Sequence, residues 1–214
     1  MKVRAILFDL DGVILKSMEQ HLEAWQFAFK KYGIHVKKEE FYQLEGRGVK
    51  AVVQELTRIY NIDTKLAPLI MEDKINYYDK IYKAEFYDGL FDLLAYLQDN
   101  KIKMAIVTGG SRNRVKRLLQ DYLNGLFSAI VTSDDVQNTK PFAEPYLKGA
   151  QLLGLNVQEC LVIENAPLGI QSAKNAGMRV IAIQTTLGEE HLRQADYIVS
   201  SMKEVQAKIQ SLLK

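Results

Sequence analysis

Short apolar runs rich in valine and isoleucine recur along this chain, and longer segments with helical periodicity separate them. The runs cover residues 3–8, 104–107, 129–131, 161–163, 180–183 and 197–199. Apolar runs of this length are typical of strands that are buried on both faces, as in a parallel sheet covered by helices. The later runs recur at the spacing of strand–helix–strand units. The pattern therefore predicts an α/β fold with a parallel sheet.

The interval between the first two runs breaks this pattern, because it is far longer than the others and contains only helix signals. Ser17 and Gln20 have the spacing of a capping box, and Gly33 supplies a stop. Three apolar faces at helical spacing follow one another: Met18, His21, Trp25, Phe29 and Tyr32; Val49, Val52, Val53, Leu56 and Ile59; and Leu66, Leu69, Ile70, Tyr77 and Ile81. We therefore expect a helical unit at residues 14–85, inserted into a core formed by residues 1–13 and 86–214.

Composition narrows the classes of function. The chain has 214 residues with 28 basic and 26 acidic side chains, so we expect no strongly charged surface for nucleic acid or membranes. Its apolar runs are far shorter than the roughly 20 residues that span a bilayer. Asp9 and Asp11 interrupt any apolar signal sequence, which favours a cytoplasmic protein. Cys160 is the single cysteine, so no internal disulfide can form and a cysteine-based metal site is not expected.

Two aspartates, Asp9 and Asp11, end the first apolar run. Side chains two residues apart in a strand point to the same side, so both carboxylates are expected at the carboxyl edge of the sheet, where open α/β sheets bind ligands. Two such charges repel unless a cation lies between them, and Mg²⁺ is a hard cation that prefers oxygen ligands. The alternative for an isolated sequence of this kind is an Asx turn with Gly12 at the bend.

Polar groups also follow the next two strands. The second run ends at Thr108, and Gly109 and Gly110 form a turn that can present a hydroxyl and backbone N–H groups to a phosphate oxygen. An ordinary connection with Ser111 as a helix N-cap is the alternative. Lys140 precedes a proline after the third run, which favours an extended backbone that holds the ammonium over the sheet edge. A solvated lysine is the alternative there.

The fourth strand ends in Glu164 and Asn165, just before Pro167, a residue suited to the first turn of a helix. Asn165 either belongs to the site or caps that helix. Because each polar group follows a successive parallel strand, we expect all of them to meet at one edge. A carboxylate pair, a hydroxyl, a lysine and a further acid can supply the nucleophile, proton donor, phosphate clamp and cation site of phosphoryl transfer.

These residues resemble a known set of motifs. Asp9-Leu10-Asp11-Gly12-Val13, Thr108, Lys140-Pro141 and Glu164-Asn165, in this order, look like the four motifs of the haloacid dehalogenase-like superfamily, in the branch with β-phosphoglucomutase and small phosphatases. The resemblance covers essentially the whole chain and implies a Rossmann-like core, a helical cap, Mg²⁺ and an aspartyl-phosphate intermediate. It also implies that Asp9 is the nucleophile and Asp11 the acid/base. It further implies that Thr108 and Lys140 hold the phosphate, with Gly109 and Gly110, and that the metal site comprises Asp9, Asp11, Glu164 and Asn165.

The chain departs from the branch at two positions. Asn165 stands where the branch usually has a second acid. An amide oxygen can ligate Mg²⁺ but adds no charge, so we expect binding at millimolar rather than micromolar Mg²⁺, and tighter binding in Asn165→Asp. Ala143 replaces the second proline of the third motif, which affects the stiffness of the loop more than its chemistry.

The cap is expected to select the substrate. His21 and Trp25 match residues often found at this place in the branch, and His21 is expected to approach Asp11 when the cap closes. A histidine satisfied within a helical core is the alternative. Arg47 lies in a glycine-containing loop comparable to the phosphate-binding loop of the mutase, and Lys74 matches a basic cap residue there. Arg112 either meets a substrate anion or faces water.

Several functions remain compatible with the sequence. The first is an Mg²⁺-dependent phosphatase acting on a small phosphorylated metabolite, most simply a sugar phosphate, and the second is a sugar phosphomutase that uses the same aspartyl phosphate. A phospho-acceptor signalling domain is disfavoured, because the nucleophile lies in the first strand beside Asp11 and a large cap follows. A purely binding member of the fold is disfavoured by the presence of Asp9, Asp11 and Lys140. A monomer is compatible with the sequence, which does not fix the oligomeric state.

Overall fold

The computed structural model describes residues 2–213. One parallel sheet contains six strands in the order β3-β2-β1-β4-β5-β6. The strands are β1 (Ala5–Phe8), β2 (Lys103–Val107), β3 (Ala129–Val131), β4 (Cys160–Glu164), β5 (Arg179–Ile183) and β6 (Tyr197–Val199). They coincide with the apolar runs, so the predicted α/β fold with a Rossmann-like parallel sheet is confirmed. The strand order reverses between β1 and β4, and ligands of open α/β sheets bind in the crevice at such a point.

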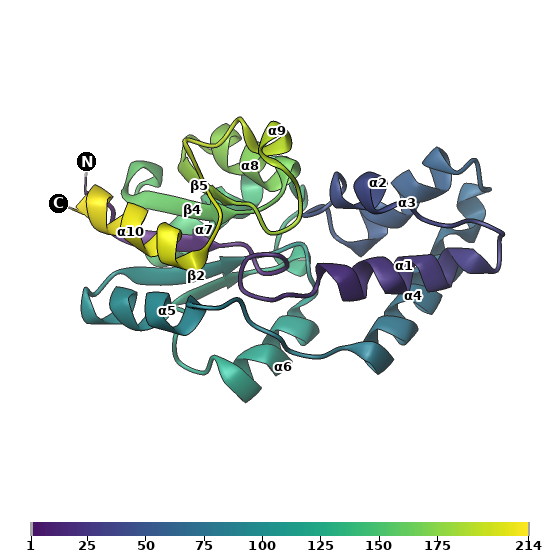
Figure 1. Cartoon of the computed structure of the whole chain (residues 1–214), viewed down its shortest axis with the longest axis horizontal. Helices are drawn as coiled ribbons and strands as arrows, with labels where there is room; N and C mark the ends of the chain where they lie inside the picture. Colours follow the sequence, from purple (N-terminus) through teal and green to yellow (C-terminus); the bar gives the residue numbers. More distant parts are fainter. Residues whose placement is uncertain (1, 214) are drawn as a thin grey trace.

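Helices cover both faces of this sheet, as Figure 1 shows. One face carries α5 (Leu90–Asp99), α6 (Arg112–Tyr122) and α10 (Met202–Leu213), and the other carries α7 (Glu144–Leu153), α8 (Pro167–Asn175) and α9 (Glu189–Leu192), with short 3₁₀ turns η2 (Ser133–Asp135) and η3 (Val157–Glu159) between elements. Successive side chains of β1 point to opposite faces, so Ile6 and Leu7 enter different clusters. Apolar side chains therefore cover both faces of the sheet, so only the ends of the strands can contribute polar groups to a site.

A second body of helices lies beside the carboxyl edge of the sheet (Figure 1). It consists of α1 (Met18–Lys30), α2 (Lys38–Tyr42), α3 (Val49–Ile59), η1 (Thr64–Leu66) and α4 (Ala67–Ile81). Trp25, Phe29 and Leu56 belong to its own buried cluster. We call this body the cap. The chain enters it directly after β1 and leaves it beside the entry point, because Lys16 N–H donates to the Glu85 carbonyl at 2.8 Å.

The capping box expected at the start of α1 is wrong. Ser17 precedes the helix but makes no side-chain capping bond, and its hydroxyl instead donates to Asp11. Gln20 uses its amide on the returning chain: its nitrogen donates to the Lys83 carbonyl at 3.0 Å, and its oxygen accepts from the Lys83 N–H at 2.8 Å. Both side chains therefore tie the connections between cap and sheet together.

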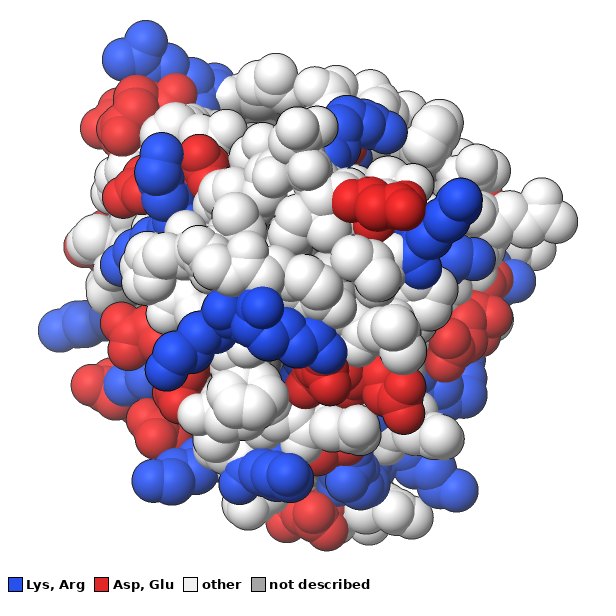
Figure 2. All heavy atoms as spheres, turned by 90° about the vertical axis from the view of Figure 1, so that its right-hand side faces the viewer, with Lys and Arg blue, Asp and Glu red and all other residues white. Residues whose placement is uncertain are grey.

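The surface adds two observations. Every helix within residues 2–213 is too short or too polar to cross a bilayer. Figure 2 views the molecule from the cap end, where basic and acidic side chains are interspersed among neutral ones.

Candidate active site

A cavity of about 800 Å³ lies between the cap and the carboxyl edge of the sheet. The core lines it with Asp9, Asp11 and the loop after β2, and the cap lines it with side chains that include His21, Trp25, Glu45, Arg47 and Lys74. The strand-end groups predicted from the sequence therefore meet the cap residues at one place. The cavity is large enough for a small metabolite.

Lys140 is at the centre of the core side of this site. Its ammonium donates to Asp9 Oδ1 and to Glu164 Oε1, each at 2.6 Å, and its side chain is buried. Tyr146 on α7 donates its hydroxyl to the same oxygen of Glu164 at 2.9 Å. Although burial opposes it, the two carboxylates raise the pKa of Lys140 above its ordinary value. The lysine is therefore a fixed positive charge.

The two carboxylates that Lys140 joins, Asp9 and Glu164, differ in their surroundings. Burial raises the pKa of Asp9 to about 7, although Lys140 acts in the opposite direction. Glu164 also accepts the backbone N–H groups of Asn165 and Ala166 on Oε2, at 2.9 and 3.2 Å. Both oxygens of Glu164 are thus engaged by protein donors in this conformation, whereas Asp9 lines the cavity. Glu164 as a metal ligand stays a prediction.

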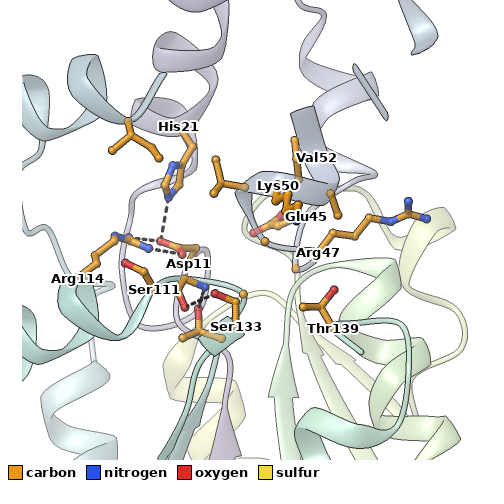
Figure 3. A pocket seen from close by; sticks show the side chains of 18 of the residues that line it. Asp11, His21, Glu45, Arg47, Lys50, Val52, Ser111, Arg114, Ser133 and Thr139 are labelled. Atoms are coloured by element: carbon orange, nitrogen blue, oxygen red, sulfur yellow. Dashed lines mark hydrogen bonds and ion pairs between the residues drawn. The ribbon is translucent and has the colours of Figure 1, made fainter. Parts of the chain in front are cut away.

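Asp11 is held from both sides, as Figure 3 shows. Arg114 on α6 forms a two-pronged ion pair with its carboxylate, with Nη1 at 2.7 Å from Oδ2. From the cap, His21 places Nε2 at 3.3 Å from Oδ1. Burial alone would raise the pKa of Asp11, but Arg114 and then His21 hold it well below its usual range. Asp11 is therefore ionised in this conformation.

His21 is linked in turn to Lys74 on α4. The Lys74 ammonium lies 2.9 Å from His21 Nδ1, and the ring of Tyr78 stacks on the imidazole at 4.1 Å between centroids. Burial, followed by the Lys74 charge, lowers the pKa of His21 to about 3. Because Lys74 donates to Nδ1, the neutral imidazole carries its proton on Nε2 and donates it to Asp11. Burial, and then Arg114, lower the pKa of Lys74 to about 7.

The turn after β2 contacts the cap directly. Thr108 is buried, and its hydroxyl oxygen accepts the Gly110 N–H at 3.0 Å. A Cβ atom on Gly109 would lie 2.7 Å from the Gly46 carbonyl oxygen and 2.8 Å from the Gly48 nitrogen, which belong to the cap loop before α3. The cap and core loops therefore meet through their backbones. The absence of a side chain at Gly109 permits this closed arrangement.

Gly109→Ala should hold the cap away from the core. Its methyl group meets fixed backbone atoms, so we expect kcat/KM to fall about 10²-fold through misplacement of the cap. Solution scattering should show a more extended particle, while the thermal midpoint of unfolding stays nearly constant. Gly110→Ala is the matched control for cap position, because its methyl group would meet only side-chain atoms of the core, Arg114 Nη1 at 3.2 Å and Thr108 Oγ1 at 3.3 Å. Equal cap positions in the two variants would contradict this account of closure.

Asn165 is buried directly after β4, and only the nitrogen of its amide group makes hydrogen bonds. Its nitrogen donates to Glu45 Oε1 at 2.8 Å and to Thr186 Oγ1 at 3.1 Å, whereas Oδ1 is buried without a hydrogen-bond partner. The alternative role as a helix cap is not seen, because Ala166 precedes α8 and no side chain caps that helix. An unsatisfied buried acceptor needs a donor or a cation.

These donors suit an oxygen-preferring cation such as Mg²⁺. Asp9 offers a carboxylate at the cavity, and Asn165 offers the free amide oxygen. Within residues 2–213, no three His, Cys, Asp or Glu side chains are grouped as metal ligands. A cation at this place would therefore depend on the amide oxygen and on backbone or solvent oxygens as well as on Asp9.

Two arginines differ in their relation to the cavity. Arg47 lines it, but its guanidinium points away from Asp11 (Figure 3) and lies 3.9 Å from Glu55. Arg112 is half exposed, pairs with Asp135 and does not line the cavity. Arg114 was not predicted from the sequence. It lies one helical turn after Ser111 and follows Arg112 and Asn113, so the first turn of α6 is rich in side chains that donate hydrogen bonds. Glu45 and Tyr146 were not predicted either.

Comparisons with known proteins agree with this geometry. The profile of the haloacid dehalogenase-like hydrolase family matches residues 6–183. Hexitol phosphatase A of Escherichia coli K12 is 29% identical over 219 residues, covering 96% of this chain and 94% of that enzyme. The solved structure of β-phosphoglucomutase from Clostridium difficile has a TM-score of 0.84 at 26% identity and covers 98% of both chains.

One relative is much longer than this chain. The chloroplastic protein SUPPRESSOR OF QUENCHING 1 of Arabidopsis thaliana is 32% identical over 200 residues, which are 91% of this chain but 19% of that protein. The similarity to the two enzymes, in contrast, extends over sheet and cap alike.

Proposed function

Because this chain belongs to the haloacid dehalogenase-like hydrolase family and is a small-molecule phosphatase or phosphomutase, we propose that it is an Mg²⁺-dependent phosphatase with an aspartyl-phosphate intermediate. One observation carries the proposal: Lys140 holds Asp9 at the floor of a cavity that the cap covers, with Asp11 beside it. The proposed substrate is a small phosphorylated metabolite, most simply a sugar phosphate.

In the first half-reaction, an oxygen of Asp9 attacks phosphorus and the bond from phosphorus to the substrate oxygen breaks. Asp11 protonates that oxygen as it leaves. Water then attacks the phosphorus of the aspartyl phosphate, Asp11 accepts its proton, and inorganic phosphate leaves Asp9. The Thr108 hydroxyl, Lys140 and the backbone N–H groups of Gly109 and Gly110 would hold the phosphoryl oxygens.

Asp9, the amide oxygen of Asn165 and a backbone oxygen near Asp11 would hold Mg²⁺. Glu164, which accepts from Lys140 in this conformation, would join them if it exchanged that partner. The cation would offset the negative charge between Asp9 and the phosphoryl group. Asp11 is ionised beside Arg114 and His21, which suits the second half-reaction, where it accepts a proton. To act first as an acid, it must exchange these partners as the substrate enters and take up a proton from solvent or from a protonated substrate phosphate.

The cap, for which we propose residues 14–85, would enclose the substrate and exclude bulk water. Movement would occur in the paired connections at residues 14–17 and 86–89, where Lys16 bonds Glu85 and Leu15 pairs with Phe86.

A monomer in the cytoplasm remains our prediction.

A sugar phosphomutase is the second candidate. The likeness to β-phosphoglucomutase over the full length of both chains favours it. The two functions differ in the acceptor of the phosphoryl group, which is water in the phosphatase and a sugar hydroxyl in the mutase.

A screen of phosphorylated metabolites with Mg²⁺ tests the proposal. It should include hexitol and hexose phosphates, as well as glucose 1-phosphate with a bisphosphate activator. Release of inorganic phosphate from one substrate supports the phosphatase, and isomerisation of a sugar phosphate without release supports the mutase. Neither product from any substrate, in folded protein that binds Mg²⁺, would contradict both.

The KM for the substrate should depend on pH through the protonation of Lys74. Its pKa of about 7 means that it is cationic below pH 7 and neutral above, so an anionic substrate loses its attraction as pH rises. We expect KM to increase about tenfold between pH 6 and pH 8.5, as for the loss of a charged hydrogen bond. Lys74→Met should have the high KM at all pH values, and Lys74→Arg the low KM. A wild-type KM profile retained in Lys74→Met would assign the titration to another group.

A further inference from the structure

Glu45 is a cap residue whose carboxylate enters the core. It lies in the loop between α2 and α3, and its side chain is only 5% exposed. Its Oε1 accepts the amide hydrogen of Asn165 at 2.8 Å, and a Cβ atom on Gly12 would lie 3.0 Å from the same oxygen. The next residue, Gly46, lies against the Lys140 stem, where an added Cβ atom would be 3.0 Å from Cδ. Glu45 thus reaches the floor of the site, beside the strand-end motifs.

No basic side chain among residues 2–213 pairs with this carboxylate. Lys140 is shared by Asp9 and Glu164, and Arg114 is paired with Asp11. Among the ion pairs of residues 2–213, none joins Glu45 to a lysine or arginine. Its hydrogen-bond partners are the neutral groups of Asn165 and Thr186. A buried carboxylate without a cation is costly, and burial raises the pKa of Glu45 well above its ordinary value, although the hydrogen bond from Asn165 opposes this. A divalent cation bound beside Asn165 would favour the ionised form of Glu45.

The orientation of Asn165 is the second, independent observation. Because its nitrogen is held by Glu45 and Thr186, its oxygen must face the other way, and there it is buried without a partner. A carboxylate on one side of the amide therefore leaves a free oxygen acceptor on the other. The contact with Glu45 exists only while the cap loop is seated on the core, whereas Thr186 belongs to the core itself.

We propose that Glu45 is a positioning residue of the cation site: it orients the Asn165 amide and supplies the negative charge that this amide lacks. The proposal rests on the proposed function, since the cation is the proposed Mg²⁺. Because Glu45 belongs to the cap, the full affinity for the cation is reached only when the cap is closed. By reciprocity, the bound cation favours closure to the same extent. The cap thereby takes part in metal binding as well as in covering the substrate.

Calorimetric titration of the whole, substrate-free protein with Mg²⁺ tests this inference without relying on turnover. Glu45→Gln keeps the size of the side chain and removes its charge, so we expect the Kd for Mg²⁺ to increase tenfold or more. Glu39→Gln is the matched control, because Glu39 is an exposed acid of the same cap. Its Kd should equal that of the wild type. Thermal unfolding of each variant verifies that the cap remains folded.

A double variant that moves the negative charge from residue 45 to residue 165 gives a second test. The double variant Glu45→Gln with Asn165→Asp moves the carboxylate from the cap to the core and keeps an amide opposite it. We expect its Kd to return to within about threefold of the wild type, and Asn165→Asp to improve affinity more in the Glu45→Gln background than in the wild type. Solution scattering should show that Mg²⁺ closes the wild-type cap, but that closure no longer depends on Mg²⁺ in the double variant.

Two results would overturn the inference in distinguishable ways. An unchanged Kd in Glu45→Gln, with the wild type binding Mg²⁺ and releasing phosphate, would remove Glu45 from the cation site and leave the proposed function intact. Absence of Mg²⁺ binding by the wild type would remove the cation itself, and the inference would fail together with the metal dependence of the proposed function.

Discussion

Asp9→Asn should eliminate covalent labelling by a phosphoryl donor and lower turnover on the order of 10⁴-fold or more, because the amide cannot serve as the attacking carboxylate. The change keeps the shape of the side chain, and Lys140 retains its bond to Glu164. Loss of activity should therefore come from chemistry and leave substrate binding largely in place. Rapid quenching followed by intact-protein mass spectrometry measures the labelled fraction directly.

The control for this experiment is Asp92→Asn, which changes an exposed aspartate on α5. It should label and turn over like the wild type. Asp11→Asn gives the complementary result: we expect labelled protein to accumulate while turnover falls about 10²–10⁴-fold, since the proton transfer step is lost. Wild-type phosphatase activity in Asp9→Asn would rule out the covalent mechanism.

Lys140→Met should destabilise the protein by about 3–5 kcal/mol, because it leaves two buried carboxylates without their common cation. Urea unfolding measures this loss. Lys116→Met, on the exposed side of α6, should change the free energy of unfolding only slightly.

A second variant separates the loss of charge from the loss of packing. In Lys140→Met combined with Glu164→Gln, one of the two unpaired charges is removed, so the double variant should recover part of the stability. A Lys140→Met protein that loses less than about 1 kcal/mol would show that the three groups are not coupled as described.

The strand-end residues were predictable from the sequence because each follows an apolar run, and the carboxyl ends of parallel strands meet at one edge. Asp9, Thr108 and Glu164 lie at or directly after the ends of their strands, so this rule alone places them at the edge. Lys140 follows β3 only after a loop that contains η2, and the sequence left a solvated lysine as the alternative. The same rule explains why the sheet was correctly predicted although the insertion separates β1 from β2.

Contacts between side chains that come from different parts of the fold could not be predicted in this way. Arg114 reaches Asp11 and Glu45 reaches Asn165 only because the cap and α6 come to the sheet edge from distant parts of the chain. No local pattern marks those two side chains as different from other exposed-looking charges on a helix or loop. Ser17 shows the converse, since its hydroxyl, which the capping pattern assigns to a backbone N–H of α1, donates to Asp11 instead.

The meeting of Gly109 with Gly46 and Gly48 has a consequence for how such an enzyme can change over evolution. The two loops touch through main-chain atoms, so this contact does not depend on which side chains line the cavity. If Arg47 and Lys74 select the substrate as proposed, we expect mutations at these two positions to change the range of accepted metabolites while the cap still closes in the same place. We therefore expect cap closure and substrate choice to change independently during evolution, so that a new specificity can arise without a change in how the two loops meet.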